Sequence, residues 1–294
     1  GGESWDFTYV PLTQQLGYTP CYVSPPPYML NDSQTNAEYV VNAINRIYSA
    51  SGNKKVPIMS WSQGGLITQW AFTFFPSTIG KTDRFVSFAG DFRGTAFAYA
   101  LDALPTGIAP TIWQQSTFSA LKNAGGLQQK VPTTSIYSTT DEIVEPQEGP
   151  GIASSNLPGA KNVLVQDTCG PLFIVEHSQE LFNAFTYKVA VSALMSPTGV
   201  ARNQDFSSAD CSEDFPAPLP ADDRAKTPTI LAQAAIHIIA GPRVACEPKL
   251  KTYAAKYYPN PVQACNPLAF IGQSIQTPPI FNDYESLAYY VLTH

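Results

Sequence analysis

The sequence predicts an α/β protein in which a mostly parallel β-sheet is covered by helices on both faces. Over the first two thirds of the chain, short apolar runs alternate with helix-like segments at the spacing typical of a parallel sheet. The 294 residues are 44% hydrophobic and only 14% charged, which supplies ample apolar material for a core. A serine-containing turn between a predicted strand and a predicted helix is the third observation. We expect a single domain over residues 1–294, whose tail at 266–294 shows no usable periodicity.

The elements follow in order along the chain. Short apolar runs predict strands at residues 18–23, 56–60, 84–89, 135–138 and 163–167. Periodicity and length predict helices at residues 36–49, 64–75, from 178 onward and 222–240. Thr35 and Glu38 predict a capping box at the start of the first helix, and Pro76 ends the second. Residues 198–220 are polar and proline-rich, so we expect an irregular excursion there.

The turn between the second strand and the second helix has the pattern of a nucleophile elbow. It reads Ser60, Trp61, Ser62, Gln63, Gly64. A strained turn needs small residues two before and two after the nucleophile, and Ser60 and Gly64 meet that steric demand. The pattern predicts that the Ser62 hydroxyl stands at the carboxyl edge of the sheet. The backbone N–H of Gln63 is then a candidate donor to an oxyanion.

A serine nucleophile needs a base within hydrogen-bond reach, and histidine is the usual one. The chain has three histidines. His294 is the last residue, and His237 lies in a helical run between two isoleucines. His177 follows a predicted strand and a loop, so we predict His177 as the general base and keep His237 as the alternative.

The acid of a triad is expected after a strand and before the histidine. Asp91, Asp141 and Asp167 all satisfy this order. We prefer Asp141 because it immediately precedes the histidine strand and because two neighbouring threonines supply hydroxyl groups that can hold a carboxylate. Asp91 is interpreted as a strand-end cap or as a second carboxylate beside the site.

Composition excludes several classes of function. The net charge is −6, with no long run of either sign, so a nucleic-acid partner is not expected. No run reaches the roughly 18–20 apolar residues of a membrane span. The five cysteines show no C-x-x-C spacing, which argues against a metal site and for disulfides. Together with one glycosylation sequon at Asn31, this predicts a secreted, extracellular glycoprotein.

Seven collinear motifs resemble the fungal lipase B family of the α/β-hydrolase superfamily. They are LGYTPC (16–21), SPPPYMLND (24–32), SWSQGGL (60–66), LKNAGGL (121–127), DEIVEPQ (141–147), CGPLFIVEH (169–177) and AGP (240–242). The resemblance runs from about residue 1 to 265. It implies the α/β-hydrolase fold and places Ser62, Asp141 and His177 on the triad of that family.

The resemblance also implies roles for further residues. Those matching the substrate pocket are Trp61, Asp91, Gln115, Ile143, Val144 and, on the helix near the C-terminus, Leu231, Ala235 and Ile238. The apolar stripe of that helix is, on spacing alone, an ordinary core face. The implied disulfides join Cys169 to Cys211 and Cys246 to Cys265.

The chain departs from the family pattern before Gly1. In the family, an N-terminal strand and a Gly/Thr-rich loop precede this position, and a threonine of that loop completes the oxyanion hole. These residues are absent from the sequence, so we name Gln63 as a donor without naming its partner. The family partner of Cys21 also lies in that segment, which leaves Cys21 as the unpaired fifth cysteine.

The expected function is hydrolysis of fatty-acid esters by a triacylglycerol lipase or carboxylesterase, through an acyl-enzyme intermediate. No cofactor and no metal are expected, and we expect a monomer that meets an ester or lipid substrate, including at a lipid–water interface. Residues 101–104 are a candidate lid. Two alternatives remain open. One is a catalytically impaired or non-catalytic protein of the same fold that lacks a complete oxyanion hole, and the other is an amidase or peptidase with the same triad.

Overall fold

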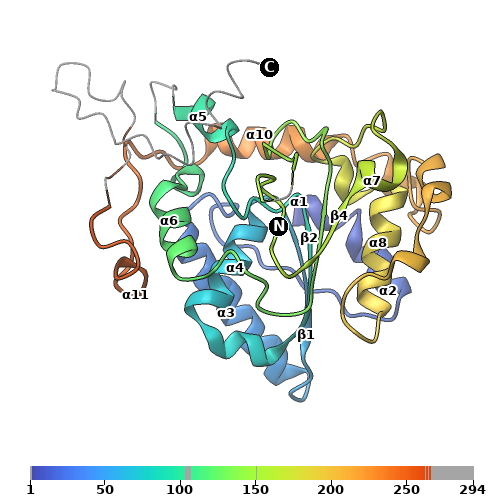
Figure 1. Cartoon of the computed structure of the whole chain (residues 1–294), viewed down its shortest axis with the longest axis horizontal. Coiled ribbons are helices and arrows are strands. Elements are labelled where there is room, and N and C mark those ends of the chain that lie inside the picture. Colours follow the sequence, from blue (N-terminus) through green and yellow to red (C-terminus); the bar gives the residue numbers. More distant parts are fainter. Residues whose placement is uncertain (1, 103–106, 150, 262, 264, 266–294) are drawn as a thin grey trace.

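The computed structural model describes residues 2–102, 107–149, 151–261, 263 and 265 (Figure 1). In this part of the chain, four strands form one parallel sheet in the order β1-β2-β3-β4. The strands are β1 (Val56–Trp61), β2 (Thr82–Phe88), β3 (Thr133–Tyr137) and β4 (Lys161–Leu164). Since all four run parallel, their carboxyl ends meet at one edge, where the loops that carry chemistry are expected.

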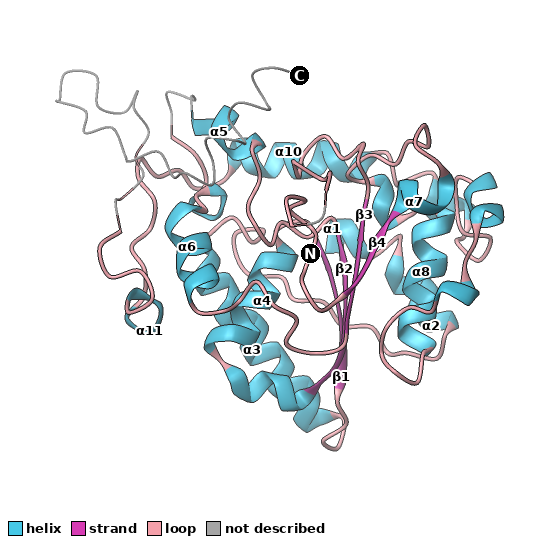
Figure 2. Cartoon of the chain, in the orientation of Figure 1, coloured by secondary structure: helices cyan, strands magenta, loops and turns pink. Residues whose placement is uncertain are grey.

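Helices lie on both sides of the sheet and across its carboxyl edge (Figure 2). The α-helices are α1 (Gly2–Trp5), α2 (Tyr9–Gln15), α3 (Ser33–Ala50), α4 (Gly64–Phe74), α5 (Phe97–Asp102), α6 (Gln115–Asn123), α7 (Val165–Cys169), α8 (Ala184–Met195), α9 (Ala221–Arg224), α10 (Thr229–Ala240) and α11 (Thr252–Ala255). Short 3-10 helices occur at Pro76–Lys81, Pro110–Ile112, Gln179–Leu181, Asn203–Asp205 and Ser208–Ser212. Helices α3, α4 and α6 lie on one side, α2, α7 and α8 on the other, and α10 crosses above the strand ends.

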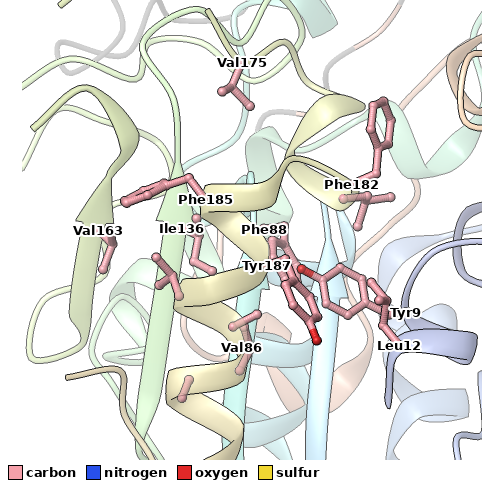
Figure 3. Close-up of a cluster of buried hydrophobic side chains, with 14 of the residues drawn as sticks. Tyr9, Leu12, Val86, Phe88, Ile136, Val163, Val175, Phe182, Phe185 and Tyr187 are labelled. Carbon is pink, nitrogen blue, oxygen red and sulfur yellow. The ribbon is translucent and has the colours of Figure 1, made fainter. Parts of the chain in front are cut away.

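Alternation along β2 divides the core into two clusters. Val86 and Phe88 point toward α8 and pack with Ile136 and Phe185 (Figure 3). Phe85 points to the opposite face, where it belongs to the cluster formed with α3 and α4. This period of two is the one expected for a strand that is buried on both faces. The rigid sheet between two packed layers fixes the positions of the strand ends.

The predicted fold class is confirmed by this layout, and four of the predicted strands are present with ends shifted by a few residues. The strand at 163–167 is shorter, because β4 ends at Leu164 and α7 begins at Val165. The strand predicted at 18–23 is wrong: these residues pair with no strand in the described part of the chain. Residues 18–23 and β1 both line a large cavity. The cavity lies between the two segments, whereas neighbouring strands of a sheet must lie within hydrogen-bond distance of each other.

Two helix predictions also need correction. Helix α3 begins at Ser33, and the Asp32 side chain accepts a hydrogen bond from the backbone N–H of Gln34. The predicted capping box at residues 35 and 38 therefore lies inside the helix, where Glu38 binds Lys251 instead. The helix predicted over 222–240 is divided into α9 and α10, because Pro228 removes a backbone donor between them.

Candidate active site

Ser62 occupies a strained turn between β1 and α4. Its φ is +57°, a left-handed conformation that non-glycine residues adopt rarely. The Ser62 N–H donates to the carbonyl of Phe88 at 2.9 Å, which fixes the turn to the end of β2. A Cβ built on Gly65 would lie 2.7 Å from the Cα of Gly90, so only glycine lets α4 approach the sheet this closely.

Three side chains meet at the end of this turn. His177 Nε2 lies 3.0 Å from Ser62 Oγ, and His177 Nδ1 lies 2.8 Å from Asp141 Oδ2. His177 and Asp141 are both 2% exposed. With Nδ1–H donating to the carboxylate, Nε2 is left as an acceptor for the serine hydroxyl. The geometry therefore suits removal of a proton from Ser62 by His177.

The Asp141 carboxylate is held from its other side. Its Oδ1 accepts hydrogen bonds from the backbone N–H groups of Ile143 and Val144, each at 2.8 Å. Two N–H donors on Oδ1 fix the plane of the carboxyl group and leave Oδ2 directed at the imidazole. The turn after β3 therefore presents the acid in one orientation.

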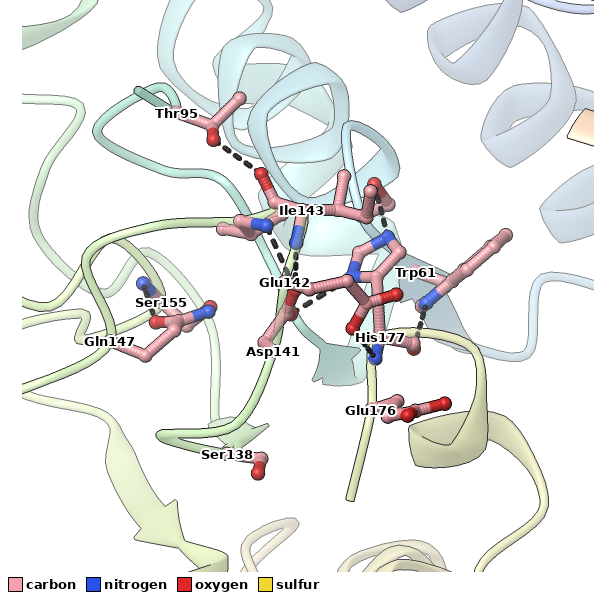
Figure 4. Close-up of polar contacts among 12 residues, drawn as sticks. Trp61, Thr95, Ser138, Asp141, Glu142, Ile143, Gln147, Ser155, Glu176 and His177 are labelled. Carbon is pink, nitrogen blue, oxygen red and sulfur yellow. Dashed lines mark hydrogen bonds and ion pairs between the residues drawn. The ribbon is translucent and has the colours of Figure 1, made fainter. Parts of the chain in front are cut away.

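Two residues position the loop that carries His177 (Figure 4). The Glu142 side chain accepts from the His177 N–H at 2.9 Å, and the Trp61 indole N–H donates to the His177 carbonyl at 3.0 Å. The Trp61 ring also lies against the imidazole, with centroids 4.8 Å apart. Glu142 was not predicted as a site residue, because a bond from a side chain to a backbone has no characteristic spacing in the sequence.

Gln63 directly follows the serine at the N-terminus of α4. Its side chain is occupied: Nε2 donates to the Met29 carbonyl at 3.1 Å, and Oε1 accepts from Thr111 at 2.8 Å. These bonds join the elbow to the turn at Met29 and to the 3-10 helix at Pro110–Ile112. The Gln63 backbone N–H lies where the helix dipole is positive, which is favourable for an oxyanion.

A cavity of about 760 Å³ contains the Ser62 hydroxyl and the His177 ring. Several predicted pocket residues line it, namely Trp61, Asp91, Ile143, Leu231, Ala235 and Ile238. Its walls are mainly aliphatic and aromatic, with a few polar groups near the serine. The cavity also extends along the outer edge of β1.

Two predicted pocket residues lie elsewhere. Gln115 begins α6 and does not line the cavity, whereas its neighbour Gln114 does. Gln114 precedes the helix with a non-helical backbone, and its side chain donates to Asp91 Oδ2 at 2.6 Å. Val144 is buried and does not line the cavity, and its backbone N–H donates to Asp141.

Asp91 places a carboxyl group in the wall of this cavity. It is 2% exposed, and burial raises its pKa to about 7 from an ordinary value of 3.8. The hydrogen bond from Gln114 opposes this rise only in part. Near neutral pH the group therefore changes between a neutral acid and an anion.

Comparison with known proteins assigns the family. No protein-family model matches the chain. Lipase B of Pseudozyma antarctica is 51% identical over 267 residues, which cover 87% of this chain and 76% of that protein. The crystal structure of Aspergillus fumigatus lipase B matches with a TM-score of 0.76 at 32% identity; the match covers 86% of this chain and 64% of that chain, less than two thirds of its length. The chain belongs to the lipase B family.

Membership in the lipase B family confirms the predicted resemblance and the α/β-hydrolase fold, and it confirms the predicted class, a carboxylic ester hydrolase. Among the described residues of this chain, no group of histidine, cysteine and acidic residues is arranged to hold a metal ion. None of its described helices combines the length and the apolarity of a membrane span.

The cysteines of this lipase B family member form the two disulfides implied by the resemblance. Cys169 bonds to Cys211, and Cys246 bonds to Cys265. Cys21 is exposed and has a free thiol. Of the predicted lid at 101–104, residues 103 and 104 lie outside the described residues, and Leu101 in α5 lines the cavity. The tail at 266–294 and His294 also lie outside them.

Proposed function

We propose that this chain hydrolyses carboxylic esters of fatty acids through Ser62 as nucleophile, His177 as general base and Asp141 as the orienting acid. The observation that carries the proposal is the continuous series of contacts from Ser62 Oγ to His177 Nε2 and from His177 Nδ1 to Asp141, at 3.0 and 2.8 Å. A serine hydroxyl is a weak nucleophile, and a buried imidazole at this distance is the group that activates it.

In the first half-reaction, Ser62 Oγ attacks the ester carbonyl carbon while its proton passes to His177 Nε2. The imidazolium that forms is stabilised by Asp141, whose other oxygen is already satisfied by two backbone donors. The negative charge on the carbonyl oxygen is stabilised by the backbone N–H of Gln63. Collapse of the tetrahedral species breaks the bond to the alcohol oxygen, which takes the proton from Nε2.

In the second half-reaction, water replaces the alcohol. His177 removes a proton from the water as its oxygen attacks the acyl carbon on Ser62. The second tetrahedral species releases the carboxylic acid and returns the proton to Ser62 Oγ. The same two nitrogens of His177 therefore serve both halves, and no other reactant is required.

The lining of the cavity suits an acyl group of low polarity. The α10 residues Leu231, Ala234, Ala235 and Ile238 face the cavity along one stripe, and Ile143 lies beside the catalytic acid. Burying methylene groups against such a wall contributes about 0.8 kcal/mol per group, which favours fatty acyl chains over short polar ones.

Further properties belong to the same proposal. We infer a secreted enzyme, supported by the two disulfides, and a glycan on Asn31, whose side chain is exposed. We also infer one domain and a monomer acting on lipid substrates. The amidase and the non-catalytic alternatives are not favoured by the family assignment.

Turnover of an ester and of the matched amide tests the proposal. The wild-type chain is expected to hydrolyse p-nitrophenyl octanoate and to leave octanoyl p-nitroanilide almost unchanged, while Ser62→Ala removes ester turnover. The folded chain failing to cleave the ester, or Ser62→Ala retaining full rate, would refute the proposed function.

A further inference from the structure

One wall of the cavity is a helix with few anchors along its length. In α10 only Ile230 is fully buried, and Ile236 and Ile239 are 61% and 71% exposed. Arg243 holds the C-terminal end of the helix by donating to the carbonyls of Ile239 and Gly107, at 2.7 and 2.8 Å. The middle of the helix has no comparable hydrogen bond to another described element, so its distance from the opposite wall depends on side-chain contacts.

One such contact is an aromatic stack near the C-terminal end of α10. The rings of Tyr28 and His237 are parallel within 7°, and their centroids lie 3.7 Å apart. Both residues line the cavity. No hydrogen bond to the His237 ring nitrogens occurs among the described residues, so the face-to-face contact of the rings is what joins them. The neighbouring Gly241 adds to this contact, because a Cβ there would lie 2.6 Å from Leu30 Cδ1.

On the Tyr28 side of the stack, hydrogen bonds hold the backbone of the turn. Tyr28 and Met29 both have left-handed backbones, with φ of 56° and 62°. The Met29 carbonyl accepts hydrogen bonds from Asn36 at 2.7 Å and from Gln63 at 3.1 Å. The turn that presents Tyr28 is therefore tied to α3 and to the elbow that carries the nucleophile. Through the stack, α10 is held at a fixed distance from this turn.

The stack also stands at one end of the apolar stripe. Leu231, Ala234 and Ile238 recur on the cavity face of α10, and His237 lies in the same last turn as Ile238. An acyl chain lying along the stripe toward Ile238 contacts the stacked rings of Tyr28 and His237. Extra methylene groups displace two stacked rings less easily than they displace a single side chain.

We propose that the stacked pair Tyr28–His237 determines acyl-chain specificity, by ending the apolar track on α10 and holding that helix against the turn at residues 25–29. This rests on the proposed function, because it concerns which fatty acyl esters Ser62 accepts. Neither ring takes part in the chemical steps. Long or branched acyl groups must displace the stack, and short straight ones need not.

The test is a ratio of specificity constants. We compare kcat/KM for p-nitrophenyl dodecanoate with that for p-nitrophenyl butanoate in the wild type, Tyr28→Ala, His237→Ala and the double variant. Either single replacement is expected to raise the ratio about tenfold, the lower end of the effect that one methylene group has in an apolar pocket. The double variant should match either single one, because both remove the same contact.

Three controls sharpen the test. Tyr28→Phe and His237→Phe keep a ring on each side and should keep the wild-type ratio. Tyr39→Ala removes an exposed tyrosine on α3 that does not line the cavity, and it should change nothing. Thermal unfolding shows which variants fold, and His237→Ala carries the test where Tyr28→Ala does not fold.

The outcomes separate the two proposals. If the wild type cleaves both esters but ring removal leaves the ratio unchanged, the role of the stack is overturned and the proposed function is retained. The same holds if the two single changes add up in the double variant. A folded wild type that cleaves neither ester refutes the proposed function and the specificity role with it.

Discussion

The imidazole Nδ1 of His177 lies 2.8 Å from Oδ2 of Asp141, with both side chains removed from solvent. This contact sets the tautomer in which Nε2 can accept the Ser62 proton. Asp141→Asn preserves the shape but favours the opposite tautomer, so kcat is expected to fall about 10⁴-fold. Steady-state kinetics on one chromogenic ester measures this.

A matched variant distinguishes the acid from its alternative in the sequence. Asp167 is exposed on α7, and Asp167→Asn is expected to retain the wild-type kcat. Comparable losses in the two variants would remove Asp141 from the role of orienting acid.

The two glycines that open α4 differ in how closely the sheet approaches them. A Cβ on Gly65 meets backbone at 2.7 Å, whereas one on Gly64 meets the Ser60 Cβ at 3.3 Å. Gly65→Ala should therefore lower the free energy of unfolding by about 1–3 kcal/mol, and Gly64→Ala by less. Urea unfolding followed by tryptophan fluorescence compares the two. Gly80→Ala, where no atom lies within 4 Å of the new Cβ, is the neutral reference.

Burial of Asp91 couples stability to pH. Because its pKa is about 7 in the folded chain against 3.8 ordinarily, the folded state binds the proton more tightly than the unfolded state. The resulting stabilisation is full below about pH 4 and is lost as pH rises through about 7. The side chain of Asp91→Asn cannot ionise. The increase in its free energy of unfolding relative to the wild type should therefore be larger at pH ~8 than at pH ~5, by on the order of 1 kcal/mol or more. An equal gain at both pH values would show that Asp91 does not titrate in this range.

Glu247 binds the N-terminus of α6, the helix that follows Gln114. Its carboxylate accepts hydrogen bonds from the Ser116 N–H and hydroxyl, both at 2.8 Å, and it is buried. Glu247→Ala leaves these donors without an acceptor, and the free energy of unfolding should fall by about 1–3 kcal/mol. Glu148→Ala, on an exposed carboxylate, serves as the control for calorimetry. A loss no larger than in the control would mean that water replaces the carboxylate.

The sharp turn at Ser62 and the order of the elements around it could be predicted from the sequence because both depend on local patterns. An apolar run followed by small residues around Ser62 requires a strand, a tight turn and a helix, and the structure has all three. The strand predicted at 18–23 is wrong because strand pairing depends on two segments, and the apolar run at 18–23 carries no information about which segment would pair with it.

Polar positions were harder to predict, for a geometric reason. At a helix N-terminus a shift of one residue turns the side chain by roughly 100°. Gln114, in the N-cap position, lines the cavity, and Gln115, the first residue of α6, does not. Glu142 and Gln166 hold the loops around His177 through bonds to backbone groups, such as the 2.9 Å bond from the Thr139 N–H to Gln166. Such bonds follow from the fold and leave no periodic pattern in the sequence.

Covalent labelling tests the activated serine most directly. The folded chain is treated with a p-nitrophenyl alkylphosphonate, and the intact mass and the labelled peptide are determined. We predict one phosphonyl group per chain, on Ser62, with labelling slowed by several orders of magnitude in His177→Ala. A label on another residue, or equal labelling in the two proteins, would contradict activation of Ser62 by His177.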